Sequence, residues 1–302
     1  MKECAWEKLG MIYEVDNDHP SLVTHASNPL AYHLGGDIFR IFYSGRDSQN
    51  RSSISYVDFD IEQRKIVNDH KNPIAEPKEN TFYSHGITIG NCWNQDGDDY
   101  IGFMGWQQRE GHHWRGDIGK VNLRTKEISM LLGTNEEDKV SLSYPHIIHE
   151  NGLYKMWYGS TISWTSVNGE MVHVIKYATS KDCETWDFKG VAIPYEIGKA
   201  QAFSKPSVHK DIDGYHMWFS YRSGDGTPYR IGYAFSKNGE AWSMKQSNLN
   251  ISAKGWDKNM VCYPHVFKHK ENLYMLYNGD KYGREGFGLA KANLNLGDNH
   301  VT

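Results

Sequence analysis

Short runs of apolar and aromatic residues, separated by polar turns, recur along the whole chain. Five segments share one template. Its first position is a small residue, its second is polar or aromatic, and its third is usually proline; an apolar pair, a polar turn and an aromatic strand follow. The third template position falls at Pro29, Gly86, Pro145, Pro206 and Pro264, with spacings of 57, 59, 61 and 58 residues. Repeats of strands and turns at a period in this range are typical of β-propellers.

Each repeat continues with a third strand, and two repeats add a closely related turn and fourth strand at 180–190 and 236–246. The pattern therefore predicts an all-β fold, with residues 1–302 forming a single five-bladed β-propeller of four-stranded antiparallel blades. The last repeat ends after its third strand, near Leu294, so we expect the N-terminal strand Trp6–Val15 to complete and close the last blade. No stretch keeps a helical apolar period for three turns.

Composition agrees with this architecture and excludes several classes of protein. Aromatic residues make up 13% of the 302 residues, and the 29 glycines supply turns. The 33 basic and 37 acidic residues give a net charge of −4, so the chain lacks the excess of basic residues that is typical of nucleic-acid-binding proteins. No apolar run is long enough for a membrane span, and the N-terminus carries charges where a signal peptide is apolar. We expect a cytoplasmic protein without a nucleic-acid or membrane partner.

The four cysteines, Cys4, Cys92, Cys183 and Cys262, lie far apart and lack the spacing of zinc ligands. In a cytoplasmic chain they are expected to be reduced, mostly buried thiols.

Antiparallel alternation places the start of each first strand and the loop between the second and third strands on one face. These loops are long and mix charged with aromatic residues, as functional loops on a rigid scaffold do. They supply candidate catalytic carboxylates, which are Asp47, Asp225, Asp280 and Glu285. They also supply, at their start or within them, candidate substrate-binding residues, which are Arg46, Trp106, Trp164, Arg222, Tyr282 and Arg284.

The residues just before the third template position are expected to converge on a funnel at the axis. They are Asn28, His85, Tyr144, Lys205 and Tyr263. All five are polar or amphipathic, so they form either a pocket floor that contacts substrate or a hydrogen-bonded plug of the channel. His85 is a candidate catalytic acid or base because its ordinary pKa is near neutral; the alternative is a hydrogen-bonded channel histidine.

Three motifs together resemble the five-bladed glycoside hydrolase superfamily, which includes arabinanases, β-xylosidases, invertases, levansucrases and mannoside phosphorylases. They are the repeated x-Pro-x-apolar start, the Tyr-x-Met-Trp-Tyr strand at 154–158, and the turn shared by 177–186 and 233–242. The resemblance implies an acid and a second carboxylate at the site. Where arabinanase-type members carry these groups, this chain has Asn28, Tyr144, and Ser204 with Lys205, so it resembles a divergent member without the usual catalytic carboxylates.

Three functions therefore remain open. A glycosidase-like enzyme, which is what we expect, would act on a small or anionic glycoside in polysaccharide metabolism through relocated carboxylates. A glycosyltransferase or phosphorylase would hold a phosphorylated or nucleotide sugar with Lys205, Arg46, Arg222 and Arg284. The third function is that of a non-catalytic glycan-binding propeller. In any of the three, Trp106, Trp114, Trp164 and Tyr282 would stack on sugar faces.

The expected ligand in each case is a carbohydrate or a sugar phosphate. No cofactor or metal is expected. The resemblance implies an axial calcium ion near a channel histidine, a position that His265 matches loosely, but calcium prefers oxygen ligands. The sugar and the oligomeric state are left open by the sequence.

Overall fold

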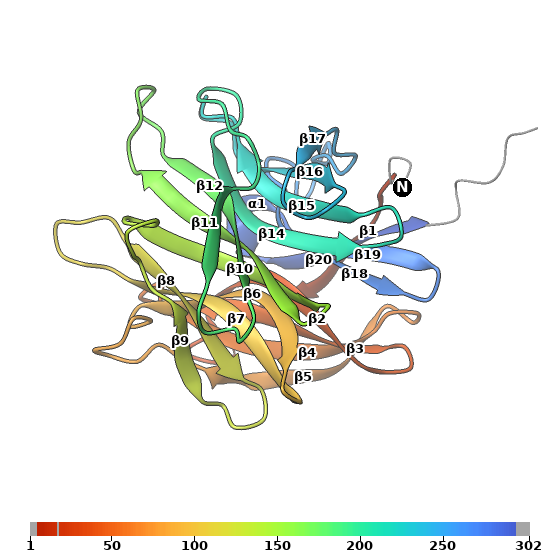
Figure 1. Ribbon diagram of the computed structural model, residues 1–302. Helices are drawn as coiled ribbons and strands as arrows, with labels where there is room; N and C mark the ends of the chain where they lie inside the picture. The colour runs from red at the N-terminus through yellow and green to blue at the C-terminus, as the bar shows by residue number, and fades with distance from the viewer. Residues whose placement is uncertain (1–4, 17, 294–302) are drawn as a thin grey trace, which may run out of the picture.

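The computed structural model describes residues 5–16 and 18–293, and its regular secondary structure is almost entirely β-strand (Figure 1). The described residues contain twenty strands and one four-residue helix, α1 (Asp280–Gly283), whose Lys281 and Tyr282 have left-handed rather than helical backbone angles. No helix in this part of the chain has the length and hydropathy needed to cross a membrane. The predicted all-β class is confirmed.

The strands lie in three sheets, one of four strands and two of eight. Each eight-stranded sheet consists of two antiparallel runs of four strands, joined by one parallel pair, Ser52 opposite Gly86 or His173 opposite Ala202. Each run of four strands is called a unit below. The first four units follow chain order. The first unit contains β2 (Thr24–Gly35), β3 (Ile38–Arg46), β4 (Ser52–Asp60) and β5 (Lys65–Ala75), and the second contains β6 (Gly86–Gln95), β7 (Asp98–Gln107), β8 (Arg115–Asn122) and β9 (Ile128–Leu132). The third contains β10 (Ser141–Glu150), β11 (Leu153–Ser163), β12 (Val172–Ser180) and β13 (Asp187–Val191), and the fourth contains β14 (Ala202–Lys210), β15 (Tyr215–Arg222), β16 (Arg230–Ser236) and β17 (Ser243–Lys245).

The fifth unit combines the two ends of the chain. It contains β18 (Cys262–His269), β19 (Asn272–Asn278), β20 (Gly286–Asn293) and β1 (Glu7–Glu14), in the order β18-β19-β20-β1. β1 pairs antiparallel with β20, from Glu7 opposite Lys291 to Glu14 opposite Gly286. Leu294, the predicted end of this unit's third strand, and Cys4 lie outside the described residues.

Apolar side chains pack between neighbouring units. One cluster joins Tyr43 and Phe59 of the first unit to Leu276 and Phe287 of the fifth, and all four are buried. Burial of this kind stabilises a protein by about 25 cal/mol for each Å² of apolar surface removed from water. Of the cysteines in this part of the structure, Cys183 and Cys262 are buried and Cys92 is partly buried, and all three are free thiols.

A two-residue bulge interrupts the first strand of four units. In the third unit Ser143 lies opposite Gly159 and His146 opposite Trp157, so Tyr144 and Pro145 have no partner in the ladder. The residue before the proline has a left-handed backbone in all four, with φ between 37° and 54°, and these residues are Asn28, Tyr144, Lys205 and Tyr263. A bulge changes the direction in which side chains point. This bulge recurs near the start of the first strand in these four units.

The second unit has its bulge in a different place from the one predicted. The shift in β6 falls between Ile89 and Cys92, so Gly90 and Asn91, rather than His85 and Gly86, correspond to the bulge residues of the other units. The expected alignment of His85 with the four other funnel residues was therefore wrong. Glycine is required here because a Cβ atom on Gly90 would lie 2.3 Å from the carbonyl oxygen of Pro145.

Side chains also tie each unit to a backbone amide of the next. In each of the following pairs, the side chain of the first residue accepts a hydrogen bond from the backbone amide of the second: Ser44 and Ile89, Asn91 and Ile147, His146 and Val208, Ser207 and Val266, and Asn278 and Asn28. The first four bonds run from each unit to the following one, and the fifth runs from the last unit back to the first.

The bond from the last unit to the first gives a testable prediction. Asn278 is fully buried; its Oδ1 accepts from the Asn28 amide at 2.8 Å, and its Nδ2 donates to the carbonyls of Ala26 and Gly286 at 2.9 Å each. Asn278→Ala leaves three buried groups without this partner, so we expect the free energy of unfolding to fall by about 2–3 kcal/mol. Urea unfolding measures the change. Asn272→Ala, at the start of the same strand, should stay within about 0.5 kcal/mol of the native protein.

Candidate functional site

A cavity of about 630 Å³ opens on the face that carries the loops after β3, β7, β11, β15 and β19. All five units contribute to its wall. The lining residues are Ser27, Asn28, Arg46, Gln49, Asn50, His85, Thr88, Met104, Trp106, Gln108, Trp114, Ser143, Tyr144, Met171, His173, Ser204, Arg222, Tyr229, Tyr263 and Tyr282. Two arginines are included, and no aspartate or glutamate is among these lining residues.

Three bulge residues form part of this wall, as the sequence predicted for the funnel. They are Asn28, Tyr144 and Tyr263, and the two tyrosine rings lie 5.7 Å apart. Asn28 is fully buried; its side-chain Nδ2 and Oδ1 make no hydrogen bond of normal geometry with the described protein atoms, and its amide interacts with the side chain of Tyr144. Burying an amide without hydrogen bonds of normal geometry is unfavourable, so a polar group of a ligand at this position would gain two hydrogen-bonding atoms.

Lys205, the fourth bulge residue, does not line the cavity. Its side chain is buried, and Nζ donates a hydrogen bond of 2.6 Å to the carbonyl of Gly90. This bond connects the fourth unit with the second. Burial lowers the pKa of Lys205 to about 7. The predicted contact between Lys205 and substrate therefore has no support in the cavity wall.

The histidines near the axis have different surroundings. His85 precedes β6, is partly exposed to the cavity, and has its ring 5.9 Å from that of Trp106. His146 and His265 are buried; burial, with Lys205 second, lowers the pKa of His146 to about 3 and that of His265 well below its usual range. His146 accepts the inter-unit bond from Val208 at 3.3 Å.

Sequence reasoning missed a further histidine of the cavity wall. His173 lies at the start of β12, with Nε2 2.8 Å from Ser143 Oγ and Nδ1 2.8 Å from Thr161 Oγ1. Burial lowers the pKa of His173 to about 4, so the ring is neutral near pH 7. Ser143 is fully buried in this network, which marks the trio as a wall-forming network rather than an accessible nucleophile. Thr88 in β6 and Tyr229 in the loop before β16 were also missed, because neither position carries a motif.

The two cavity arginines have different partners. Arg222 ends β15, pairs through Nη2 with Glu170 Oε2 at 3.2 Å, and lies 5.3 Å from the Tyr229 ring centre. Arg46 ends β3 and is half-buried, and no acidic side chain among the described residues forms an ion pair with it. An unpaired guanidinium on a cavity wall is a binding group for an anion.

Aromatic side chains are a second feature of the wall. Trp106 donates from Nε1 to Ser52 Oγ at 3.0 Å, and Tyr282 packs against Tyr229 and Tyr263. Trp164 does not line the cavity. Its ring instead packs edge-to-face on Trp114, which does, with centroids 4.7 Å apart. Trp164 thus supports a cavity residue from behind.

The candidate catalytic carboxylates lie outside the cavity wall. Asp47 accepts the amides of Gln49 and Arg51 and forms an ion pair with Arg51 at 2.8 Å. Asp280 accepts the amides of Asn259 and Met260 at 2.9 Å each. Asp47 therefore holds its own loop in place, and Asp280 holds the segment before β18.

Asp225 and Glu285 occupy exposed positions. Hydrogen bonds from Ser223 and then Thr227 lower the pKa of Asp225 to about 2. Glu285 lines a separate pocket of about 270 Å³ together with Arg284. The structure thus brings Asn28, Arg46, His85, Trp106, Tyr144, Arg222, Tyr263 and Tyr282 together in one cavity and leaves Asp47, Trp164, Lys205, Asp225, Asp280, Arg284 and Glu285 outside its wall.

The fold is that of structures named as glycoside hydrolases. A solved structure named "Glycoside hydrolase" has a TM-score of 0.75 at 12% identity, over 96% of this chain and 92% of that protein. A glycosyl hydrolase from Bacteroides ovatus gives 0.71 at 12% identity, over 95% and 94%. A structure from a study of the GH130 family of mannoside phosphorylases, which contains glycoside hydrolases that target beta-1,2 mannosidic linkages in Candida mannan, gives 0.71 at 13% identity, over 96% and 94%. At these identities the likeness shows the fold, and the predicted resemblance is confirmed at that level.

The chain belongs to the same family as two proteins of Mycobacterium tuberculosis. They are "Uncharacterized protein Rv1502" of strain ATCC 25618 / H37Rv and "Uncharacterized protein MT1551" of strain CDC 1551 / Oshkosh. Each is 36% identical over 297 residues, covering 95% of this chain and 98% of the relative. No protein-family model matches the chain.

Proposed function

We propose that the protein is a five-bladed β-propeller, closed by β1, that binds an anionic carbohydrate in the cavity shared by its five blades. The five antiparallel units and the hydrogen bonds that lead from each unit to the next, and from the last to the first, support the closed ring. Structural neighbours named as glycoside hydrolases and from the GH130 family of mannoside phosphorylases support a sugar as ligand.

One observation carries the choice of an anionic sugar: the cavity wall has two arginines and no carboxylate. Arg46 is half-buried without an acidic partner in the described structure, and Asn28 offers a buried amide on the wall of the same cavity. A guanidinium binds phosphate or carboxylate in a bidentate fashion. The tyrosine and tryptophan rings provide apolar faces for the sugar ring.

The same observation ranks the three functions left open by the sequence. Cleavage of a glycosidic bond by the usual route needs two carboxyl groups about 5–10 Å apart across the bond. Asp47, Asp225, Asp280 and Glu285 lie outside the wall, and three of them make the loop or turn contacts described above. Binding or transfer of a sugar phosphate, a nucleotide sugar or a uronic acid therefore fits the site better than hydrolysis by these carboxylates.

Calorimetric titration with four probes tests this proposal: glucose 1-phosphate, UDP-glucose, glucuronic acid and glucose. We expect at least one anionic probe to bind, with glucose at least about tenfold weaker. Arg46→Met should weaken that binding about 10–100-fold, because a hydrogen bond to a charged group contributes about 1.5–3 kcal/mol. Arg124→Met is the matched control, since Arg124 pairs with Asp98 in a turn on the opposite face.

Two outcomes would contradict the proposal. If glucose binds as tightly as the anionic probes and Arg46→Met has no effect, the arginine does not select an anion. If the protein instead hydrolyses aryl glycosides, and Asp47→Asn, Asp225→Asn, Asp280→Asn or Glu285→Gln abolishes turnover while affinity is kept, the glycosidase with relocated carboxylates is the correct function.

A further inference from the structure

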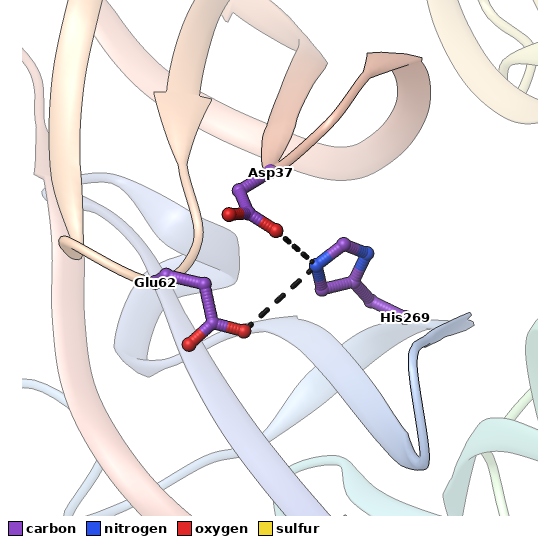
Figure 2. Close-up of side chains that lie close together, drawn as sticks. All are labelled: Asp37, Glu62 and His269. Carbon is purple, nitrogen blue, oxygen red and sulfur yellow. Dashed lines mark hydrogen bonds and ion pairs between the residues drawn. The ribbon is translucent and has the colours of Figure 1, made fainter.

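Three side chains of metal-ligating type converge on the face opposite the cavity (Figure 2). Asp37 lies in the turn between β2 and β3, Glu62 in the turn between β4 and β5, and His269 at the end of β18. One ligand atom of each lies within 4.8 Å of the other two. Figure 2 shows both carboxylates directed at the same nitrogen of the imidazole.

His269 is the buried member of this group. Its side chain is 8% exposed, and its Nε2 lies 2.9 Å from Asp37 Oδ1 and 3.9 Å from Glu62 Oε1. Ligand atoms about 3–4 Å apart suit a single ion with bonds of about 2.0–2.2 Å to nitrogen and oxygen.

A cation of the protein already uses the two carboxylates. Lys270 Nζ lies 2.8 Å from Asp37 Oδ1 and 3.1 Å from Glu62 Oε1, the same two oxygen atoms that face His269. The Lys270 side chain is 55% exposed on a flexible stem and can leave without disturbing the core.

We propose that Asp37, Glu62 and His269 form a binding site for a divalent transition-metal ion, and that Lys270 is the internal cation which the metal displaces. One imidazole nitrogen and two carboxylate oxygens suit zinc and its first-row neighbours, whereas calcium prefers oxygen ligands alone. The site lies in turns on the face away from the cavity, so it is independent of the proposed carbohydrate site.

The position of the site gives the ion a structural effect. Asp37 and Glu62 belong to the first unit, and His269 belongs to the fifth. A bound ion therefore links the two units that Asn278 also joins. An ion that binds the native protein and not the unfolded chain raises stability by mass action.

Titration of the metal-free full-length protein with zinc chloride tests the site. We expect one zinc ion per chain and a higher unfolding temperature in zinc. His269→Gln should weaken zinc binding by more than about tenfold and abolish the rise in unfolding temperature. Lys270→Met should tighten binding by roughly tenfold, because the competing ion pairs are lost. His149→Gln, at an exposed position near the end of β10, is the control and should leave zinc affinity unchanged.

Two results would overturn the proposal. If neither the native protein nor Lys270→Met binds zinc, the group is an ion-pair cluster only. If His269→Gln binds zinc as the native protein does, the zinc occupies some other place on the surface.

Discussion

Replacing Lys176 with methionine is expected to lower the free energy of unfolding at pH 7 by about 3–5 kcal/mol, because a buried carboxylate loses its cation. Lys176 Nζ lies 2.8 Å from Asp138 Oδ1, and the Asp138 side chain is fully buried. The same carboxylate accepts hydrogen bonds from Tyr158 at 2.8 Å and from Ser160. These bonds hold Asp138 in place but carry no positive charge.

Urea unfolding at pH 7 measures this effect. Lys189→Met is the matched control, because Lys189 pairs with Asp187 on the surface and exposed ion pairs contribute about 0–1 kcal/mol. A loss below about 1 kcal/mol in Lys176→Met would mean that the Asp138 charge is neutralised or solvated in some other way.

Lys205→Met is expected to have the opposite effect and to stabilise the protein at pH 7. Lys205 is fully buried, and burial lowers its pKa to about 7, against about 10.4 in an unfolded chain. Holding it with this lowered pKa costs about 4–5 kcal/mol near pH 7. Loss of the hydrogen bond to Gly90 offsets about 1–3 kcal/mol of that cost. The net gain expected for the variant is about 1–4 kcal/mol.

The pH dependence separates this explanation from a simple packing effect. Between pH 7 and pH 10 the unfolded chain keeps the Lys205 proton and the folded protein does not, so native stability rises with pH. From pH 7 to pH 9 the native protein should gain about 2 kcal/mol more than Lys205→Met. Lys268→Met, at an exposed position of β18, should keep the native pH profile. A destabilised Lys205→Met with the native pH profile would contradict the argument.

The repeat pattern predicted the order of the strands well because the same succession of strands and turns recurs in each unit. Pro29, Pro145, Pro206 and Pro264 each mark the same bulge, since proline cannot donate to the ladder and so records where pairing is interrupted. The second unit carries no such mark. Its bulge contains Gly90 and Asn91, and the template therefore settled on Gly86, five residues before Asn91.

The candidate site was only partly predictable, for a physical reason. Arg46, Trp106 and Arg222 end strands that run toward the cavity, so strand direction alone placed them. Whether a loop carboxylate faces the cavity depends instead on local hydrogen bonds. Asp47 and Asp280 bind amides of their own surroundings, which sequence reasoning cannot distinguish from a free catalytic group.

The pairing of β1 with β20 also constrains how the protein is made. During synthesis β1 leaves the ribosome long before β20, its strand partner. Until then β1 has an unpaired edge, and such edges attract other chains. The cavity needs residues from Ser27 to Tyr282, so a truncated chain cannot build it. Ligand binding would therefore report on completed folding. Because the pairing of β1 with β20 joins residues far apart in the chain, we expect it to be a slow final step of folding.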